Sequence, residues 1–292
     1  MTPSNRRRLL HCLPSMLPAL SAFVLALSLG TASAQTGLVA PTDAGSASAT
    51  YEPKRGQAGK DVVWIPTPQE LVDEMLRMAE ITPQDYLVDL GSGDGRTVIT
   101  AAQRGTRAHG IEFNPDMVEL SRRAAREAGV ADRATFVQGD IFESDFSDAT
   151  VVTLFLLPDL NLRLRPALLE MKPGTRVVSN SFDMGDWEPD ETADGGADCR
   201  SYCRAYKWIV PAKVEGRWKL DDGALLVLEQ RFQKLGGHLA IDGMQHPVSD
   251  AAMRGTQIAF SANGQRHTGE VDGGRITGRD GGGKAWSAVR ER

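Results

Sequence analysis

The sequence has few cysteines, few aromatic residues and no excess of positive charge. Three of the 292 residues are cysteine, 6% are aromatic, and 33 basic residues face 38 acidic ones, a net charge of −5. This balance offers no basic stripe that would neutralise phosphates, so nucleic acid is not an expected partner. No histidine accompanies Cys199 and Cys203 at the spacing of a zinc site, so no metal is predicted.

The first 34 residues have the composition of a targeting signal. Residues 6–8 are arginines, an apolar run extends from about residue 17 to 29, and residues 32–34 read Ala-Ser-Ala, a small-residue cleavage pattern. The run is short for a membrane span, which favours a cleaved secretory signal over an uncleaved anchor. Export to the periplasm is therefore expected, and the arginines also fit a loose twin-arginine pattern. Without the signal, 30 basic residues face 38 acidic ones, a net charge of −8.

Cleavage of this signal would leave two cysteines, Cys199 and Cys203. In an oxidising compartment a pair this close in sequence is consistent with a disulfide, and two free thiols are the alternative.

Three further segments differ in their composition. Residues 35–60 are rich in small residues and proline without apolar periodicity, which predicts a flexible linker. Residues 61–205 alternate short apolar runs with helical patterns, which predicts an α/β domain with a doubly wound, mostly parallel sheet. Residues 206–292 contain short β-like runs separated by glycine-rich turns, which predicts an antiparallel β-rich region.

Within the α/β domain the expected elements alternate regularly. A capping box at residues 67–70, with Pro68 at the first helical position, predicts a first helix over 68–80. The strands are expected at residues 86–90, 108–113, 135–138, 149–157 and 174–182, with helices between them.

The stretch from Asp89 to Arg96, DLGSGDGR, follows the first of these strands. Its glycines are spaced GxGxG, whereas a dinucleotide-binding loop needs GxGxxG to present a helix N-terminus to a pyrophosphate. Asp89 and Asp94 make the loop acidic, which disfavours phosphate and favours a cation. Ligands of open parallel sheets bind beyond the carboxyl ends of the strands, where this loop lies.

Two further signals follow the next strands. Glu112 ends the second strand, where a carboxylate can accept hydrogen bonds from both hydroxyls of a ribose. After the third strand, Asp140 is placed to bond an exocyclic amine and Ile141 to cover a base. A ribose, an adenine and a positively charged tail together describe S-adenosylmethionine.

The region from Tyr86 to Asp140 resembles the class I S-adenosylmethionine-dependent methyltransferases, through DLGSGDGR, the acidic loop GIEFNP and the adenine loop FVQGDIF. The stretches WIPTP at 64–68 and LFLLPDLN at 154–161 resemble a subgroup of small protein-lysine methyltransferases, some of which act on a rotary ATP synthase. The resemblance spans about residues 62–187. It implies these cofactor-binding residues: Thr67, Asp89, Gly91, Ser92, Gly93, Asp94, Gly95, Glu112, Asp140 and Ile141.

The expected function is methyl transfer from S-adenosylmethionine to a protein lysine or another amine, with small molecules as alternative acceptors. Methyl transfer from a sulfonium requires orientation and exclusion of water more than a dedicated base, so no catalytic residue is assigned. Asn161 and Asp183 lie in loops that could reach a substrate. The alternative is a noncatalytic exported binding protein that retains the fold.

Overall fold

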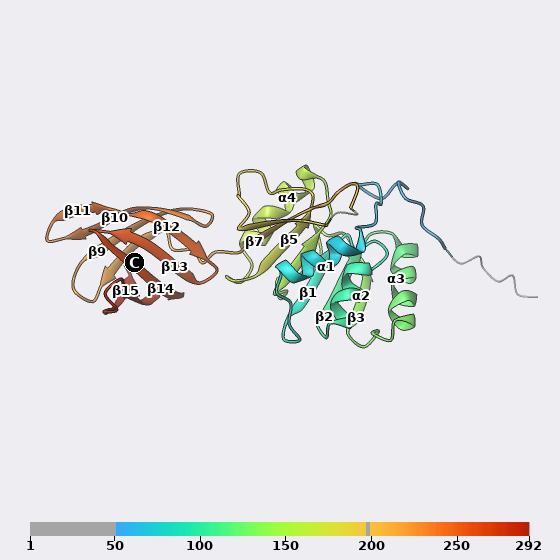
Figure 1. The fold of residues 1–292 in the computed structure, drawn as a ribbon, viewed down its shortest axis with the longest axis horizontal. Coiled ribbons are helices and arrows are strands. Elements are labelled where there is room, and N and C mark those ends of the chain that lie inside the picture. Colours follow the sequence, from blue (N-terminus) through green and yellow to red (C-terminus); the bar gives the residue numbers. More distant parts are fainter. Residues whose placement is uncertain (1–50, 197–198, 292) are drawn as a thin grey trace, which may run out of the picture. The chain divides into compact units, whose positions relative to one another are not determined.

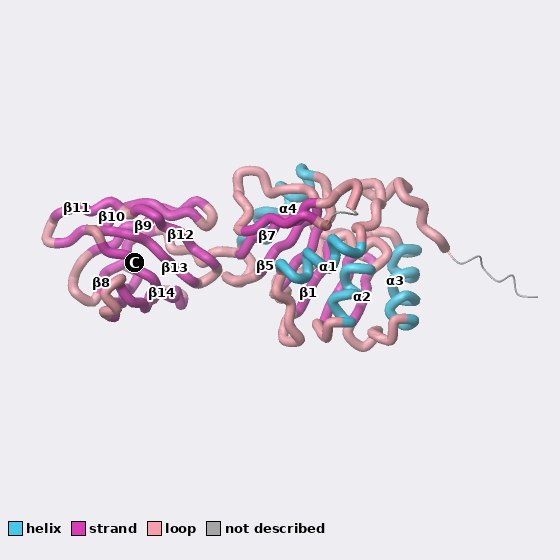
Figure 2. Tube along the Cα trace, in the orientation of Figure 1, coloured by secondary structure: helices cyan, strands magenta, loops and turns pink. Residues whose placement is uncertain are grey.

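The computed structural model describes residues 51–196 and 199–291. The predicted signal and most of the predicted linker lie outside this part. The described chain contains a seven-stranded sheet with helices, followed by a nine-stranded sheet formed by the C-terminal residues (Figures 1 and 2). None of the described helices is long and apolar enough to cross a membrane.

The seven-stranded sheet has the order β3-β2-β1-β4-β5-β7-β6. Strands β1 to β5 pair in parallel, while β7 pairs antiparallel with both β5 and β6. The elements of this part are α1 (Gln69–Met78), β1 (Tyr86–Leu90), α2 (Arg96–Gln103), β2 (Arg107–Glu112), α3 (Pro115–Glu127), β3 (Ala134–Gln138), β4 (Val151–Leu154), α4 (Pro158–Leu169), β5 (Arg176–Asn180), β6 (Glu191–Asp194) and β7 (Arg204–Ile209).

Successive strand residues contribute to two separate buried clusters. In β1, Leu87 belongs to a cluster with residues of α1, α2 and α3, whereas its neighbour Val88 belongs to a cluster with residues of α4. Val151 and Val152 of β4 divide between the clusters in the same way. This alternation is what a pleated strand produces when both of its faces are covered, and it explains why most residues of the central strands are apolar.

The predicted capping box before α1 is wrong. Pro68 is the N-cap residue, and no side chain caps this helix. The side chain of Thr67 instead accepts a hydrogen bond of 3.2 Å from the amide of Asn180, at the end of β5. The hydroxyl that was predicted to cap α1 therefore makes a tertiary contact instead. This contact joins the segment before α1 to the edge of the sheet where the strands end.

The sequence did not predict the two antiparallel strands β6 and β7 within the α/β part. Strand β6 is polar and partly exposed, so it carries no apolar pattern. Strand β7 spans the predicted domain boundary between residues 205 and 206 and pairs with β5 from Arg176↔Ile209 to Asn180↔Ala205. Trp208 of β7 is fully buried, and its indole donates to the carbonyl of Trp187 at 2.7 Å.

The C-terminal residues form an antiparallel, barrel-like sheet around a core that includes Trp218 and Phe260. Its order is β11-β10-β12-β13-β14-β15-β16-β8-β9, and β9, at one end of the series, also pairs with β10, the strand next to the other end. The strands are β8 (Gly216–Leu220), β9 (Leu225–Arg231), β10 (Lys234–Ile241), β11 (Met244–Pro247), β12 (Ser249–Arg254), β13 (Gln257–Ala262), β14 (Gln265–Asp272), β15 (Arg275–Asp280) and β16 (Ala285–Arg290). The antiparallel β-rich prediction for this region is confirmed.

Candidate functional site

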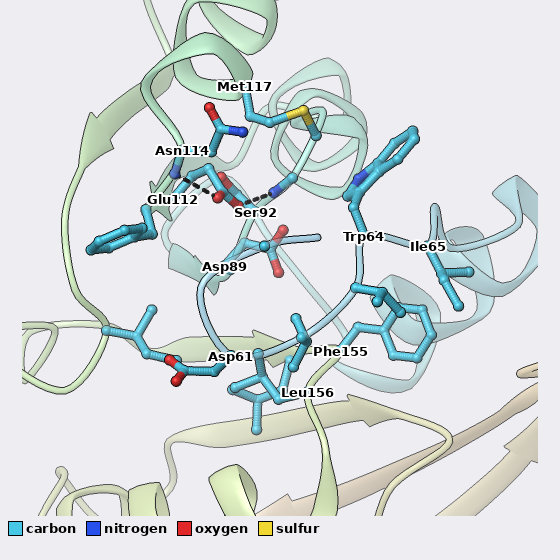
Figure 3. A pocket seen from close by; sticks show the side chains of 18 of the residues that line it. Asp61, Trp64, Ile65, Asp89, Ser92, Glu112, Asn114, Met117, Phe155 and Leu156 are labelled. Atoms are coloured by element: carbon cyan, nitrogen blue, oxygen red, sulfur yellow. Dashed lines mark hydrogen bonds between the residues drawn. The ribbon is translucent and has the colours of Figure 1, made fainter. Parts of the chain in front are cut away.

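A cavity of about 500 Å³ opens where β1, β2, β3 and β4 end (Figure 3). Its size lies within the range typical of small-molecule sites. Of the ten predicted cofactor residues, nine line it: Thr67, Asp89, Gly91, Ser92, Gly93, Asp94, Glu112, Asp140 and Ile141. The structure thus gathers residues from several loops and from the segment before α1 around one space.

Gly95 does not line the cavity. It is the N-cap residue of α2 with φ 80°, and a Cβ there would lie 2.8 Å from the ring of Phe136 and from Cβ of Ser121. Its lack of a side chain therefore permits close packing of the loop against β3 and α3. The structure gives Gly95 no contact with the cavity and so does not support a direct cofactor contact.

Gly93 has a different reason to be glycine. Its φ is 54°, and a Cβ there would lie 2.7 Å from Nε1 of Trp64. The indole of Trp64 lines the cavity next to this loop, and in the close-up it stands on the other side of Asp89 from Glu112 (Figure 3). The bare backbone at Gly93 is what allows the indole to lie so close.

The carboxylate of Glu112 is fixed by two backbone amides. Oε2 accepts from the amide of Gly93 at 2.9 Å, and Oε1 accepts from the amide of Asn114 at 2.9 Å, as the dashed lines of Figure 3 show. Each carboxylate oxygen keeps a further lone pair for a ligand. A carboxylate held this way, with two free acceptor positions, suits a pair of ribose hydroxyls.

Asp89 is a buried acid whose ion-pairing capacity is not used by the described residues. Its side chain accepts a hydrogen bond of 2.6 Å from the hydroxyl of Thr153, and only 7% of the residue is exposed. Burial raises the pKa of Asp89 to about 7, and the negative charges of Asp94 and Glu112 add to the rise, while the Thr153 bond opposes it. A cationic ligand in the cavity would stabilise the ionised form.

The hydroxyl of Ser92 also lacks a partner within the described residues. It is buried, it lines the cavity, and no protein group there accepts or donates a hydrogen bond to it. A buried unsatisfied polar atom costs folding free energy unless a ligand or water satisfies it. The Ser92 oxygen lies against Gly110, where an added Cβ would be 2.5 Å from it, so Asp89 and Glu112 are the residues that suit the cavity to a ligand with hydroxyl groups and a positive charge.

The two other predicted acids are already paired. Asp94 binds the guanidinium of Arg96, with Oδ1 3.0 Å from Nε, and Nη1 of Arg96 donates to the carbonyl of Thr67 at 2.8 Å. Asp140 forms an ion pair with Lys60 and accepts from the amide of Phe142 at 2.9 Å. The hydrogen bond from Lys60 is the main cause that lowers the pKa of Asp140. An adenine base that forms a hydrogen bond with Asp140 would share this carboxylate with Lys60.

Sequence reasoning missed several residues of the cavity wall. Lys60 lies in the predicted flexible linker, yet it lines the cavity, and nearby Ala58 forms a β-bridge with Val63. No local pattern marks Lys60, since its role depends on Asp140, a partner 80 residues away. Trp64 was visible only as part of the WIPTP resemblance, without a role of its own.

The two residues placed in substrate loops do not line the cavity. Asn161 is fully buried, and its amide donates to the carbonyls of Phe182 at 3.2 Å and Asp183 at 3.1 Å. The side chain of Asp183 accepts from the amide of Gly185 at 3.0 Å in a local turn. Asn161, whose side chain is buried, therefore cannot reach a substrate and instead fixes the loop after β5. Asp183 is exposed, and its contact with a substrate stays a prediction.

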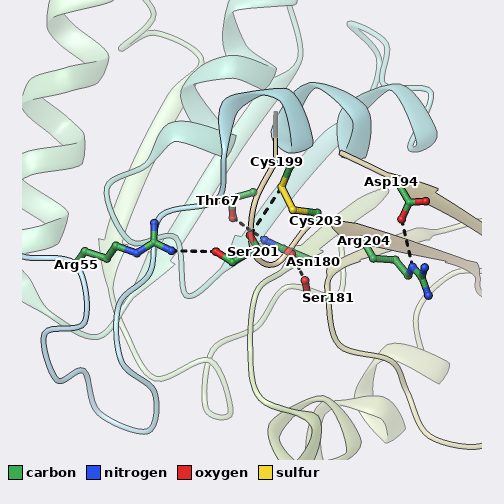
Figure 4. The surroundings of a disulfide bond; sticks show 9 residues. All are labelled: Arg55, Thr67, Asn180, Ser181, Asp194, Cys199, Ser201, Cys203 and Arg204. Carbon is green, nitrogen blue, oxygen red and sulfur yellow. Dashed lines mark hydrogen bonds and ion pairs between the residues drawn. A yellow bond between two sulfur atoms is a disulfide. The ribbon is translucent and has the colours of Figure 1, made fainter. Parts of the chain in front are cut away.

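Cys199 and Cys203 form a disulfide. The loop that it closes lies beside Thr67 and Asn180, and Ser201 accepts a hydrogen bond of 3.2 Å from Arg55 (Figure 4). Tyr202, inside this loop, lines the cavity. The disulfide therefore holds one part of the cavity wall.

Several known proteins are similar in sequence to the part of the chain that forms this site. A family model described as the ANTKMT methyltransferase domain matches residues 89–191. A protein-lysine N-methyltransferase of Saccharolobus islandicus (strain REY15A) is 44% identical over 133 residues, which are 44% of this chain and 83% of that protein. The adenine nucleotide translocase lysine N-methyltransferase of Mus musculus is 39% identical over 114 residues, 38% of this chain and 50% of that protein.

Among solved structures, an RNA methyltransferase from Salinibacter ruber in complex with S-adenosyl-L-homocysteine is 51% identical. The match covers 51% of this chain and 96% of that one, with a TM-score of 0.48. The chain thus spans most of the archaeal relative and half of the mouse one. The relative from Saccharolobus islandicus is 44% identical to this chain, and the match covers 83% of that protein's length. The chain therefore belongs to the family of S-adenosylmethionine-dependent protein-lysine N-methyltransferases.

Proposed function

We propose that this methyltransferase transfers a methyl group from S-adenosylmethionine to the side-chain amine of a protein lysine. The observation that carries the proposal is the cavity itself, whose lining includes the buried acid Asp89 and the fixed carboxylate of Glu112. The relatives named for lysine methylation supply the acceptor class.

Different residues of the cavity would bind different parts of the cofactor. Glu112 would accept from the ribose hydroxyls, Asp140 and Ile141 would hold and cover the adenine, and Asp89 would pair with a cationic group. When bound, S-adenosylmethionine would supply an activated methyl group, carried on a sulfonium, for transfer to the lone pair of the acceptor amine.

The remaining requirement is a neutral, oriented amine. A lysine must lose its proton before its lone pair is available, and an apolar wall promotes this loss by lowering the amine pKa. Phe155, Leu156 and Leu157, which follow β4, provide apolar side chains on the cavity wall. Orientation and desolvation of this kind need no dedicated base.

The test is incubation of the purified chain with labelled S-adenosylmethionine and an extract, followed by digestion to single amino acids. Label in methylated lysine supports the proposal. Label confined to RNA or to a small molecule would contradict the lysine assignment, and no transfer to any acceptor would favour the noncatalytic alternative. The net charge of −8 expected after loss of the signal argues against an RNA acceptor.

We also propose that the chain is exported to the periplasm and that its α/β part is doubly wound. The arginine cluster and apolar run of the first 34 residues support export, and the two buried clusters on alternate residues of β1 support the winding. Fusion of residues 1–34 to reporters specific for each export route tests the first point. Retention of every reporter in the cytoplasm would contradict it.

A further inference from the structure

We propose that Phe155, Phe182 and Tyr202, here called the aromatic trio, bind the ammonium group of the lysine side chain, in its protonated or methylated form. The inference rests on the proposed function and names the place where the acceptor enters. It also assigns a role to the disulfide, which holds one of the three rings.

The three rings come from separate loops and meet at the cavity. Phe155 follows β4, Phe182 follows β5, and Tyr202 precedes β7. The ring centroids of Phe155 and Tyr202 are 5.3 Å apart, those of Phe182 and Tyr202 6.1 Å, and those of Phe155 and Phe182 6.2 Å. All three side chains line the same cavity as Asp89 and Glu112.

The trio differs from the aromatic packing elsewhere in this part of the chain. Trp187 and Trp208 also lie ring to ring, 5.9 Å apart, but both are fully buried and serve as core. Tyr202 is 38% exposed, so its ring borders both solvent and the cavity. Rings open to a cavity can receive a ligand, whereas rings closed into a core cannot.

The chemistry of such rings suits a lysine side chain. Aromatic faces carry negative electrostatic potential and attract an ammonium group, while the ring surface packs against methylene and methyl groups. The preference of the rings for a cation opposes loss of the proton, so the desolvation that favours the neutral amine is assigned to the aliphatic side chains of Leu156 and Leu157. In the close-up, Phe155 lies at the end of the cavity opposite Met117 and Asn114 (Figure 3).

Two features fix the trio in position. Asn161 donates to the carbonyls of Phe182 and Asp183, which sets the course of the loop after β5. Tyr202 has φ 57°, an uncommon conformation for a residue with a side chain, and it lies within the loop closed by Cys199 and Cys203. A strained residue inside a crosslinked loop is consistent with a ring held for binding.

The experiment measures binding and does not depend on methyl transfer. The intact chain, saturated with S-adenosylhomocysteine, is titrated by NMR with N-acetyl-Nε-trimethyl-lysine methylamide and with its neutral tert-butyl carbon isostere. We expect the wild type to bind the cation about five- to tenfold more tightly than the isostere. Tyr202→Phe keeps this preference, whereas Tyr202→Leu and the double variant Cys199→Ser, Cys203→Ser lose most of it.

Unchanged affinity for S-adenosylhomocysteine in each variant shows that the fold and the cofactor site remain intact. Equal binding of cation and isostere by the wild type would overturn the inference, as would an undiminished preference in Tyr202→Leu. These outcomes leave the proposed function standing if labelled lysine is found. Absence of labelled lysine with a normal cation preference would instead refute the proposed function alone.

Discussion

Asp89 links cofactor binding to pH. Burial raises its pKa to about 7, so the carboxyl is largely neutral below pH 7 and ionised above it. A cationic cofactor prefers the ionised form, which predicts that its affinity rises as the pH increases from about 5.5 to 7, by at most about tenfold per pH unit. Calorimetric titrations with S-adenosylmethionine across this interval measure the slope.

The matched variant is Asp89→Asn, which keeps the shape of the side chain and removes its charge. We expect it to weaken binding at pH 7 and to flatten the pH profile. A wild-type affinity that is constant over this interval would show that Asp89 does not meet the positive charge of the cofactor.

Gly93→Ala tests the contact between the glycine loop and Trp64. The new Cβ would meet Nε1 of Trp64 at 2.7 Å, and φ 54° adds strain. We expect cofactor affinity to fall by about tenfold or more. The control is Gly129→Ala, where φ is 69° but nothing lies within 4 Å of the added Cβ. Equal affinities in the two variants would contradict a role for this close approach.

Among single residues, the sequence predicted those whose role follows from their position at the end of a parallel strand. Asp89 and Glu112 each lie at the end of a parallel strand, so their meeting follows from the topology alone. Lys60 and Tyr202 could not be predicted, because each reaches the cavity through partners distant in sequence or through a crosslink, Asp140 for the first and a disulfide-closed loop for the second.

A largely buried ion pair joins elements at the end of the sheet opposite the cavity, where β1 and β5 begin. Asp85, just before β1, pairs with Arg176 at the start of β5 and accepts from the hydroxyl of Thr150 at 2.7 Å. Burial opposes ionisation of Asp85, but the bonds from Thr150, Arg176 and Thr82 outweigh it and lower the pKa. We expect Asp85→Asn to reduce the free energy of unfolding by about 3 kcal/mol, because it leaves Arg176 without its counter-ion.

Denaturant unfolding of Asp85→Asn measures this loss. Asp132→Asn, which removes an exposed partner of Arg133, is the control and should change stability little. The Asp85 variant should still bind the cofactor normally at low temperature, since Asp85 does not line the cavity. Equal stability of the two variants would show that the buried pair does not hold the elements together.

Among the elements, apolar periodicity predicted the parallel strands, which are buried on both faces, and missed the antiparallel strands β6 and β7 of the α/β part. The parallel strands and their helices were placed to within a few residues. Strand β6 (Glu191–Asp194) was missed because its side chains are polar and partly exposed. Strand β7 (Arg204–Ile209) was missed although it is largely buried, because Arg204 and Lys207 interrupt its apolar pattern. Strand β4 ends at Leu154, three residues before its predicted end, because the apolar residues 155–157 line the cavity instead of continuing the sheet.

At the scale of the whole molecule, the family and the lining of the cavity both indicate an S-adenosylmethionine site. The chain that carries this site has a negative net charge. The archaeal relative shows the family, and the described residues supply the acids and the glycine loop that fit the cofactor. The proposed export places this site outside the compartment where the cofactor is made. A fold that retains the cofactor through export would reconcile the two, and a twin-arginine route provides it.

The most direct measurement is calorimetric titration of the purified chain with S-adenosylmethionine and with S-adenosylhomocysteine, at about pH 7.5, where Asp89 is mostly ionised. The cavity predicts saturable binding of both at one site per chain, lost in Glu112→Ala, which removes the carboxylate held by the amides of Gly93 and Asn114. Absence of binding of either ligand by the wild type would contradict the assignment of this cavity to the cofactor.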